Sequence, residues 1–303
     1  METHLRRHFL RFLISYHLIS SSNAEPIFGV DMNFAVLGSF NFAFLSLITN
    51  RSSTNFDEKY ICTSTLISER FVMTIAECIQ NLPLEDLEVT FGYVDKEEDE
   101  NKISGKQRSG VYPAKTTITF SEWSEKRGWP TNIPPYNDIA LIELHEYVTF
   151  KPAVISPRNH DQGIGSTVLM QGWRKIKSKL DIIQPDLPHQ APMKIISNTA
   201  CESRIKKFTK SYKKFKISDN VFCMSGASLA VALHSDIGGP VLNLAKQVIG
   251  ITVKRVPSTT SYWLDKGNVN LALRLSDYRG FINDVASSGM GSMQKKFREL
   301  NLN

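Results

Sequence analysis

The residues whose chemistry is most direct are four cysteines, which can be oxidised to disulfides: Cys62, Cys78, Cys201 and Cys223. An even number of cysteines behind a secretory signal predicts two disulfides, although four cysteines allow three pairings and spacing alone does not choose among them. A second chemical signal is the triplet Asn50-Arg51-Ser52, which is a sequon for N-glycosylation. This sequon is usable only if the chain is exported.

Two runs of charge could bind ligands. The acidic run 95–100 could donate oxygen ligands to Ca²⁺, although a solvated loop is the default for such a segment. Segment 201–216 is predicted to be an amphipathic helix, with an apolar stripe formed by Ile205, Phe208, Tyr212 and Phe215. The opposite face carries a cluster of five lysines: Lys206, Lys207, Lys210, Lys213 and Lys214. This face is either a solvated surface or an exosite for sulfated glycans, anionic lipid or an acidic protein, and we expect no nucleic acid because no aromatic residues on it could stack with bases.

Three further motifs follow one another along the chain. Segment 62–78 ends in Thr-Ile-Ala-Glu-Cys, segment 137–144 reads Asn-Asp-Ile-Ala-Leu-Ile-Glu-Leu, and segment 235–240 reads Ser-Asp-Ile-Gly-Gly-Pro. They resemble the segments of trypsin/chymotrypsin-like serine proteases that carry the catalytic histidine, aspartate and serine. The resemblance covers about residues 27–285. It implies an all-β, chymotrypsin-like double six-stranded β-barrel with a short intermediate helix and a C-terminal helix.

The same resemblance assigns the disulfides as Cys62–Cys78 and Cys201–Cys223. It also places Glu77, Asp138 and Ile237 at the three positions of the catalytic triad, so that only the orienting carboxylate is retained. Isoleucine has no nucleophilic atom, and a glutamate is a poor substitute for an imidazole base. Two carboxylates at short range should also raise one pKa. We therefore expect a catalytically inactive homologue that is not an enzyme, with no catalytic residue.

Two other kinds of chemistry at the triad positions have little support from the residues present. A hydrolase built on the paired carboxylates of Glu77 and Asp138 is conceivable, as is a metal held by these acids with His234, but no ligand spacing supports a metal. We expect no cofactor. The resemblance places Val231 at the floor of the substrate pocket, where it offers no countercharge to a basic substrate. Val253 and Arg255 fall in the segment that pairs with substrate backbone, and Arg255 would crowd the cleft.

The elements that must position these residues are short β-branched and aromatic runs separated by turn residues, which favour an all-β barrel or sandwich. Residues 1–24 are predicted to be a signal peptide, residues 25–286 the degenerate protease domain, and residues 287–303 a polar tail. No later segment is long and apolar enough to be a transmembrane helix. We expect a secreted, extracellular protein.

The resemblance is closest in its general character to insect pseudoproteases of this family. It implies a binding, cofactor or regulatory role in haemolymph or reproductive fluid, with extracellular proteins, including active serine proteases, as partners. Two alternatives stay open. One is a serine-type endopeptidase of weak activity or altered specificity, and the other is a scaffold that binds sulfated glycans through the lysine face.

Overall fold

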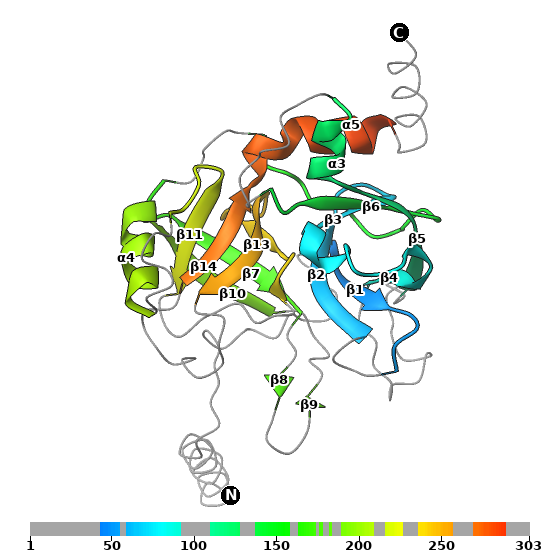
Figure 1. Ribbon diagram of the computed structural model, residues 1–303, viewed down its shortest axis with the longest axis horizontal. Helices are drawn as coiled ribbons and strands as arrows, with labels where there is room; N and C mark the ends of the chain where they lie inside the picture. The colour runs from blue at the N-terminus through cyan, green and yellow to red at the C-terminus, as the bar shows by residue number, and fades with distance from the viewer. Residues whose placement is uncertain are drawn as a thin grey trace, which may run out of the picture.

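The computed structural model describes residues 43–54, 59–91, 110–127, 137–157, 163–173, 176–177, 182–183, 189–208, 216–226, 236–256 and 269–288. The predicted signal peptide 1–24, the acidic run 95–100 and residues 289–303 of the predicted tail lie outside these ranges. The described chain forms two closed six-stranded antiparallel barrels that lie side by side (Figure 1). The expected chymotrypsin-like double barrel is therefore confirmed.

The first barrel has the strand order β1-β2-β3-β6-β5-β4. Its strands are β1 (Leu45–Asn50), β2 (Tyr60–Leu66), β3 (Phe71–Thr74), β4 (Leu87–Phe91), β5 (Gly110–Thr119) and β6 (Ala140–Leu144), with the short 3-10 helices η1 (Ala76–Cys78) and η2 (Leu84–Asp86) between β3 and β4. Because the sheet closes into a barrel, each of these six strands is hydrogen-bonded to a neighbour on both sides, and no edge strand is left. Polar side chains inside this barrel bond to one another, as the 2.8 Å contact between the Ser46 and Ser64 hydroxyls shows.

The second barrel has the order β10-β11-β14-β13-β12-β7. Its strands are β7 (Thr167–Gly172), β10 (His189–Ile196), β11 (Val221–Gly226), β12 (Pro240–Leu242), β13 (Val248–Val256) and β14 (Val269–Arg274). The short strands β8 (Ile176–Lys177) and β9 (Ile182–Ile183) form a separate hairpin. A register shift between Thr252 and Lys254 places Val253 at a bulge in β13. Bulges are frequent beside binding sites, because they redirect the strand.

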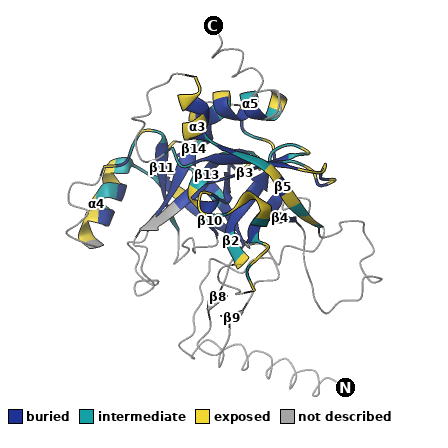
Figure 2. Ribbon diagram, turned by 45° about the vertical axis from the view of Figure 1, so that its right-hand side comes forward, coloured by how far each residue is buried: buried dark blue, intermediate teal, exposed yellow. Residues whose placement is uncertain are grey.

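The C-terminal segment ties the two barrels together. The 3-10 helix η6 (Leu275–Tyr278) and helix α5 (Arg279–Ser288) follow the last strand, and α5 lies beside α3 (Phe120–Glu125) of the first half of the chain (Figures 1 and 2). A capping box between Thr119 and Glu122 begins α3. Trp123 then donates from Nε1 to Asp284 of α5 at 3.3 Å.

Burial is continuous across both halves of the chain. One cluster of buried side chains includes strands of both barrels together with Phe281 and Val285 of α5 (Figure 2). Phe120 packs edge-on against Phe281, with ring centroids 5.6 Å apart. A shared core of this kind fixes the relative position of the barrels, and therefore of any group at their junction.

Candidate functional site

The segment Asp236–Gly239 is bonded to both barrels. On one side the backbone amide of Thr63 in β2 donates to the carbonyl of Ile237 at 3.0 Å. On the other side the amide of Gly238 donates to Thr252 in β13 at 2.7 Å. Gly238 has a positive φ of 84°, and a Cβ there would lie 2.3 Å from the Thr63 carbonyl oxygen. Only glycine fits this junction without strain.

The side chain at position 237 is apolar and partly buried. Ile237 packs against the large core cluster, so this position presents only carbon to the junction. Its neighbour Asp236 is 2% exposed, and its Oδ1 lies 2.3 Å from where a Cβ on Gly172 would stand. The Gly172 position thus makes room for a buried carboxylate directly beside Ile237.

The carboxylate of Asp138 is held by η1 of the first barrel. Its Oδ1 accepts a 2.8 Å hydrogen bond from the backbone amide of Glu77. The pKa of Asp138 is raised, chiefly by burial, while the hydrogen bonds from the amides of Glu77 and Ala76 lower it and the nearby Glu77 charge raises it further. The sequence correctly predicts a raised pKa in this pair. Its explanation is only partly right, because burial outweighs repulsion between the two carboxylates.

A buried polar network fixes the residue that precedes Asp138. The hydroxyl of Tyr278 donates to Asn137 Oδ1 at 2.7 Å and accepts from Asn220 Nδ2 at 2.6 Å. Asn220 Nδ2 also lies 3.3 Å from Asn137 Oδ1. Burial raises the pKa of the Tyr278 hydroxyl, so it remains a protonated donor at neutral pH. The second barrel thereby fixes the position of a loop of the first barrel.

The first disulfide connects the same positions covalently. Cys62 and Cys78 are bonded, as expected, with 6.1 Å between their Cα atoms. Cys62 precedes Thr63, which bonds to Ile237, and Cys78 follows Glu77, which bonds to Asp138. The three positions that the sequence singled out are therefore linked to one another through neighbouring residues. Glu77 itself is exposed on this surface.

Not all predicted pocket residues are described. Val253 is buried at the bulge of β13, within the cluster of buried side chains that includes residues of both barrels. Arg255 pairs with Asn270 through the strand register, but its side chain lies outside the described residues. Val231 and His234 also lie outside them, as do residues 95–100 of the predicted calcium loop. Within the described part of the chain, no group of three or more His, Cys, Asp or Glu side chains could hold a metal ion.

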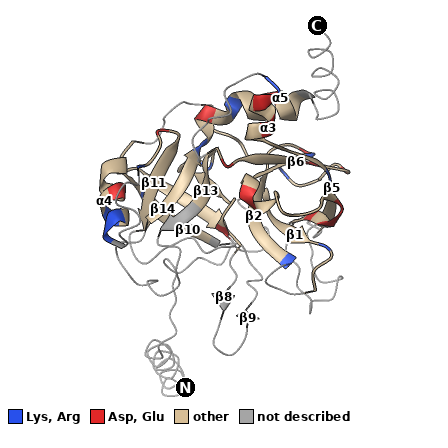
Figure 3. Ribbon diagram, viewed as in Figure 1, with Lys and Arg blue, Asp and Glu red and all other residues tan. Residues whose placement is uncertain are grey.

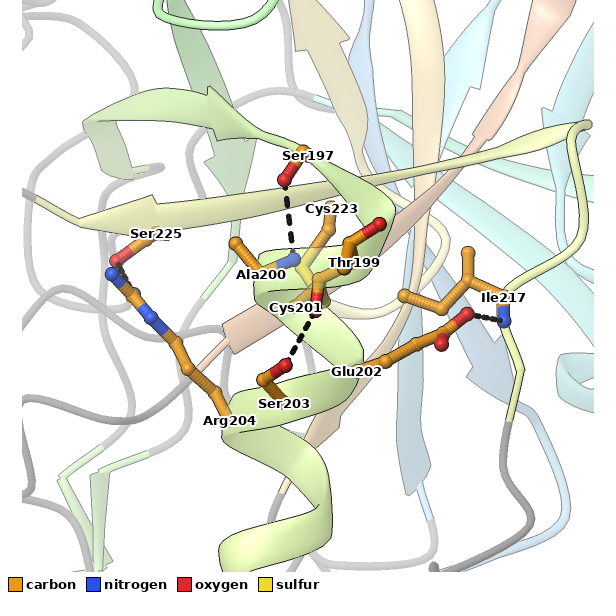
Figure 4. The surroundings of a disulfide bond; sticks show 10 residues. All are labelled: Ser197, Thr199, Ala200, Cys201, Glu202, Ser203, Arg204, Ile217, Cys223 and Ser225. Atoms are coloured by element: carbon orange, nitrogen blue, oxygen red, sulfur yellow. Dashed lines mark hydrogen bonds between the residues drawn. A yellow bond between two sulfur atoms is a disulfide. The ribbon is translucent and has the colours of Figure 1, made fainter.

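Helix α4 (Asn198–Phe208) is anchored by the second disulfide, Cys201–Cys223, which joins it to β11 as expected (Figure 4). The helix begins three residues before the predicted Cys201. Ser197 caps it by accepting from the amide of Ala200 at 3.1 Å. The sequence signal for this earlier start is Ser197, a capping residue that lies three residues before Ala200.

The basic face of α4 is less uniform than the sequence predicts. Ile205 is buried and Lys206 and Lys207 are exposed, as the amphipathic pattern requires. Lys206, however, pairs with Glu202 at 3.6 Å, so an acidic residue lies one turn from the lysines on this helix (Figure 3). The other three lysines of the predicted face, Lys210, Lys213 and Lys214, lie outside the described residues.

Comparison with known proteins decides the family. The Trypsin family model matches residues 40–262. The chain belongs to the trypsin family. Among curated relatives it is 24% identical to serine protease VLSP-1 of Macrovipera lebetinus over 66% of this chain and 67% of the relative. It is 24% identical to snake venom serine protease salmobin of Gloydius halys over 65% and 66%, so the matches span about two thirds of these relatives.

A solved structure supports the fold independently. Neuropsin, a serine protease expressed in the limbic system of mouse brain, aligns with a TM-score of 0.59 and 17% sequence identity, over 82% of this chain and 96% of neuropsin. At this identity the likeness shows the trypsin-family fold alone.

One expectation from the sequence is contradicted. The resemblance assigned Glu77 and Ile237 to the positions of the catalytic histidine and serine, and we therefore expected a chain that is not an enzyme. The trypsin-family relatives are named serine proteases, and another from Crotalus durissus terrificus is named thrombin-like enzyme gyroxin B1.3, so they point to a protease. The physical reason for the error is that a missing hydroxyl excludes one nucleophile only. Carboxylates, for example, can also act as general acids or bases.

Proposed function

We propose that this trypsin-family chain is a secreted protein that acts in an extracellular fluid by binding other proteins, as a cofactor or regulator of proteolysis. The observation that carries the proposal is the surface formed by η1. Glu77 is exposed there, while its amide is fixed to Asp138 and the following Cys78 is fixed to Cys62. A backbone that is already held in place loses little conformational entropy on binding, which favours recognition of a protein partner.

Support for export comes from covalent chemistry. Both disulfides are formed, and such bonds persist in oxidising compartments such as the secretory pathway and extracellular space. The predicted signal peptide 1–24 agrees with this setting, as does the name of one relative, snake venom serine protease salmobin. Among the described residues, no helix is long and apolar enough to cross a membrane.

A second candidate is a serine-type endopeptidase of weak activity or altered specificity. The names of the curated relatives favour it, since they are called serine proteases or thrombin-like enzymes. The two candidates differ in what they require of the isolated protein. An endopeptidase cleaves peptides by itself, whereas a cofactor or regulator changes the rate at which another protease cleaves them.

Depletion and add-back separate these candidates. The chain is removed from its extracellular fluid with an antibody, and the rate of cleavage of fluorogenic peptides is measured before and after purified chain is restored. We expect depletion to change the rate and the wild-type chain to restore it. Glu77→Lys should restore it poorly, whereas Glu146→Lys should act like wild type, because Glu146 is an exposed acid in the turn after β6. An unchanged rate after depletion would refute the regulatory role. Cleavage of a peptide library by the purified chain alone would support the endopeptidase.

A further inference from the structure

The sequon is held on the surface at the end of β1. Asn50 is the last residue of that strand and pairs with Leu87 of β4. Arg51 continues the pairing, since its amide donates to Asp86 at 2.8 Å, and its exposed side chain lies 3.7 Å from a carboxylate oxygen of Glu88. Residues 50–52 form the one Asn-X-Ser/Thr triplet in the whole sequence. The chain thus presents a single candidate asparagine at a defined surface position.

The side chains of the sequon, as far as the described residues go, are arranged so that their hydrogen bonds use the oxygen of the Asn50 amide. The hydroxyl of Ser52 donates to Asn50 Oδ1 at 2.8 Å, and the amide of Ser52 donates to the same oxygen at 3.0 Å. Both bonds use the oxygen of the Asn50 side chain. Its Nδ2 donates to none of the described residues, so it can carry a substituent without breaking a hydrogen bond seen in the fold.

We propose that Asn50 carries an N-linked oligosaccharide. The co-reactant is an oligosaccharide attached to a lipid diphosphate. A bond forms between Asn50 Nδ2 and the anomeric carbon of the first sugar, the bond from that carbon to the diphosphate breaks, and the Nδ2 proton passes to a base of the transferase. The modification rests on the export that we propose for the function.

The site flanks the junction between the barrels rather than covering it. Thr63, which bonds to Ile237, pairs with Leu47 of β1. Asn50 lies three residues further along that strand, which is about 10 Å at the usual rise per residue. The attachment point is therefore displaced along β1 from the strand position that pairs with Thr63.

The test uses the full chain secreted from cultured eukaryotic cells, once with its own residues 1–24 and once with a foreign signal peptide. Treatment with peptide N-glycosidase should lower the mass of the secreted protein and convert Asn50 to aspartate in the peptide map. Asn50→Gln and Ser52→Ala should abolish the mass change. Ser52→Thr should retain it, and so should Thr54→Ala, which alters an exposed neighbour outside the triplet.

The outcomes are separable. An unmodified Asn50 in protein secreted with the foreign signal peptide overturns the glycosylation proposal. A mass change that persists in Asn50→Gln overturns the assignment to this residue. Failure of residues 1–24 to export the chain counts against the proposed function instead, while the foreign signal peptide still reports on Asn50.

Discussion

The buried hydroxyl of Tyr278 should contribute measurably to stability. The residue is 1% exposed, and its ring packs edge-on against Phe120 with centroids 5.1 Å apart. Replacing it with phenylalanine keeps this ring contact and removes only the hydroxyl that joins Asn137 to Asn220. Tyr278→Phe therefore isolates the polar link between the second barrel and the loop that carries Asp138.

The expected cost follows from the hydrogen bonds. Each of the two bonds contributes about 1 kcal/mol net, so their loss should destabilise the fold by about 2 kcal/mol. The cost stays moderate because Asn220 Nδ2 and Asn137 Oδ1 already lie 3.3 Å apart and satisfy each other in part. For a domain of this size, 1 kcal/mol corresponds to about 2–4 °C, which predicts a decrease in Tm of about 4–8 °C.

Thermal unfolding followed by circular dichroism measures this difference. Tyr147→Phe is the matched control, because Tyr147 is 66% exposed and its ring contact with Arg70, at 4.9 Å, survives in phenylalanine. The control should unfold within about 1 °C of wild type, since exposed substitutions seldom matter. Equal Tm values for Tyr278→Phe and Tyr147→Phe would refute the claim that the network stabilises the junction.

Three other perturbations test separate parts of the site. Gly238→Ala should destabilise the protein by about 2–5 kcal/mol in urea unfolding, because it adds strain at positive φ and crowds a backbone oxygen. Asp138→Asn should be at least as stable as wild type at pH 7. The raised pKa means that the Asp138 carboxyl holds its proton more tightly in the folded protein than in the unfolded chain. The stability that this difference contributes is therefore greatest below the ordinary pKa of 3.8, and it is lost as the pH rises through the folded-state pKa. The variant should lose this dependence in urea unfolding across a pH series. Replacing Lys206 and Lys207 with glutamine should make the protein elute earlier from a heparin column, since both are exposed on α4.

Each of these results has a contradicting outcome. Wild-type stability in Gly238→Ala would show that the backbone at the junction can relax around the added methyl group. A free energy of unfolding that depends more steeply on pH in Asp138→Asn than in wild type would contradict the predicted effect of Asp138. For heparin the control is a pair of glutamine substitutions at Lys151 and Lys194, which are exposed elsewhere. If both lysine pairs elute together, the position of the charge on α4 is irrelevant.

The fold could be predicted from the sequence because its signals are local. Strand β4, which reads Leu-Glu-Val-Thr-Phe, is one of the short β-branched and aromatic runs expected of an all-β fold, and the motif around Asp138 continues into β6. The pairing of Cys62 with Cys78 and of Cys201 with Cys223 followed from resemblance and is present in the structure. Helix α3 was missed, although Thr119 and Glu122 have the spacing of a capping box.

The polar contacts of the site could not be predicted in this way. Tyr278 meets Asn137 across 141 residues of sequence, and Asn220 meets Asn137 across 83. Asparagine and tyrosine have no periodic pattern that marks such a contact, since it exists only after two barrels and a C-terminal segment have packed together. The main cause of the raised pKa of Asp138 could not be predicted for the same reason, because the extent of its burial depends on how the folded chain packs.

Sedimentation of the labelled protein in the extracellular fluid that we propose as its setting tests the central claim most directly. If the chain acts by binding other proteins, wild type and Glu146→Lys should sediment as a complex that saturates with concentration. Glu77→Lys should sediment more slowly, closer to the free chain, because it reverses the exposed charge of η1. Sedimentation of wild type as free chain at every concentration would contradict the account.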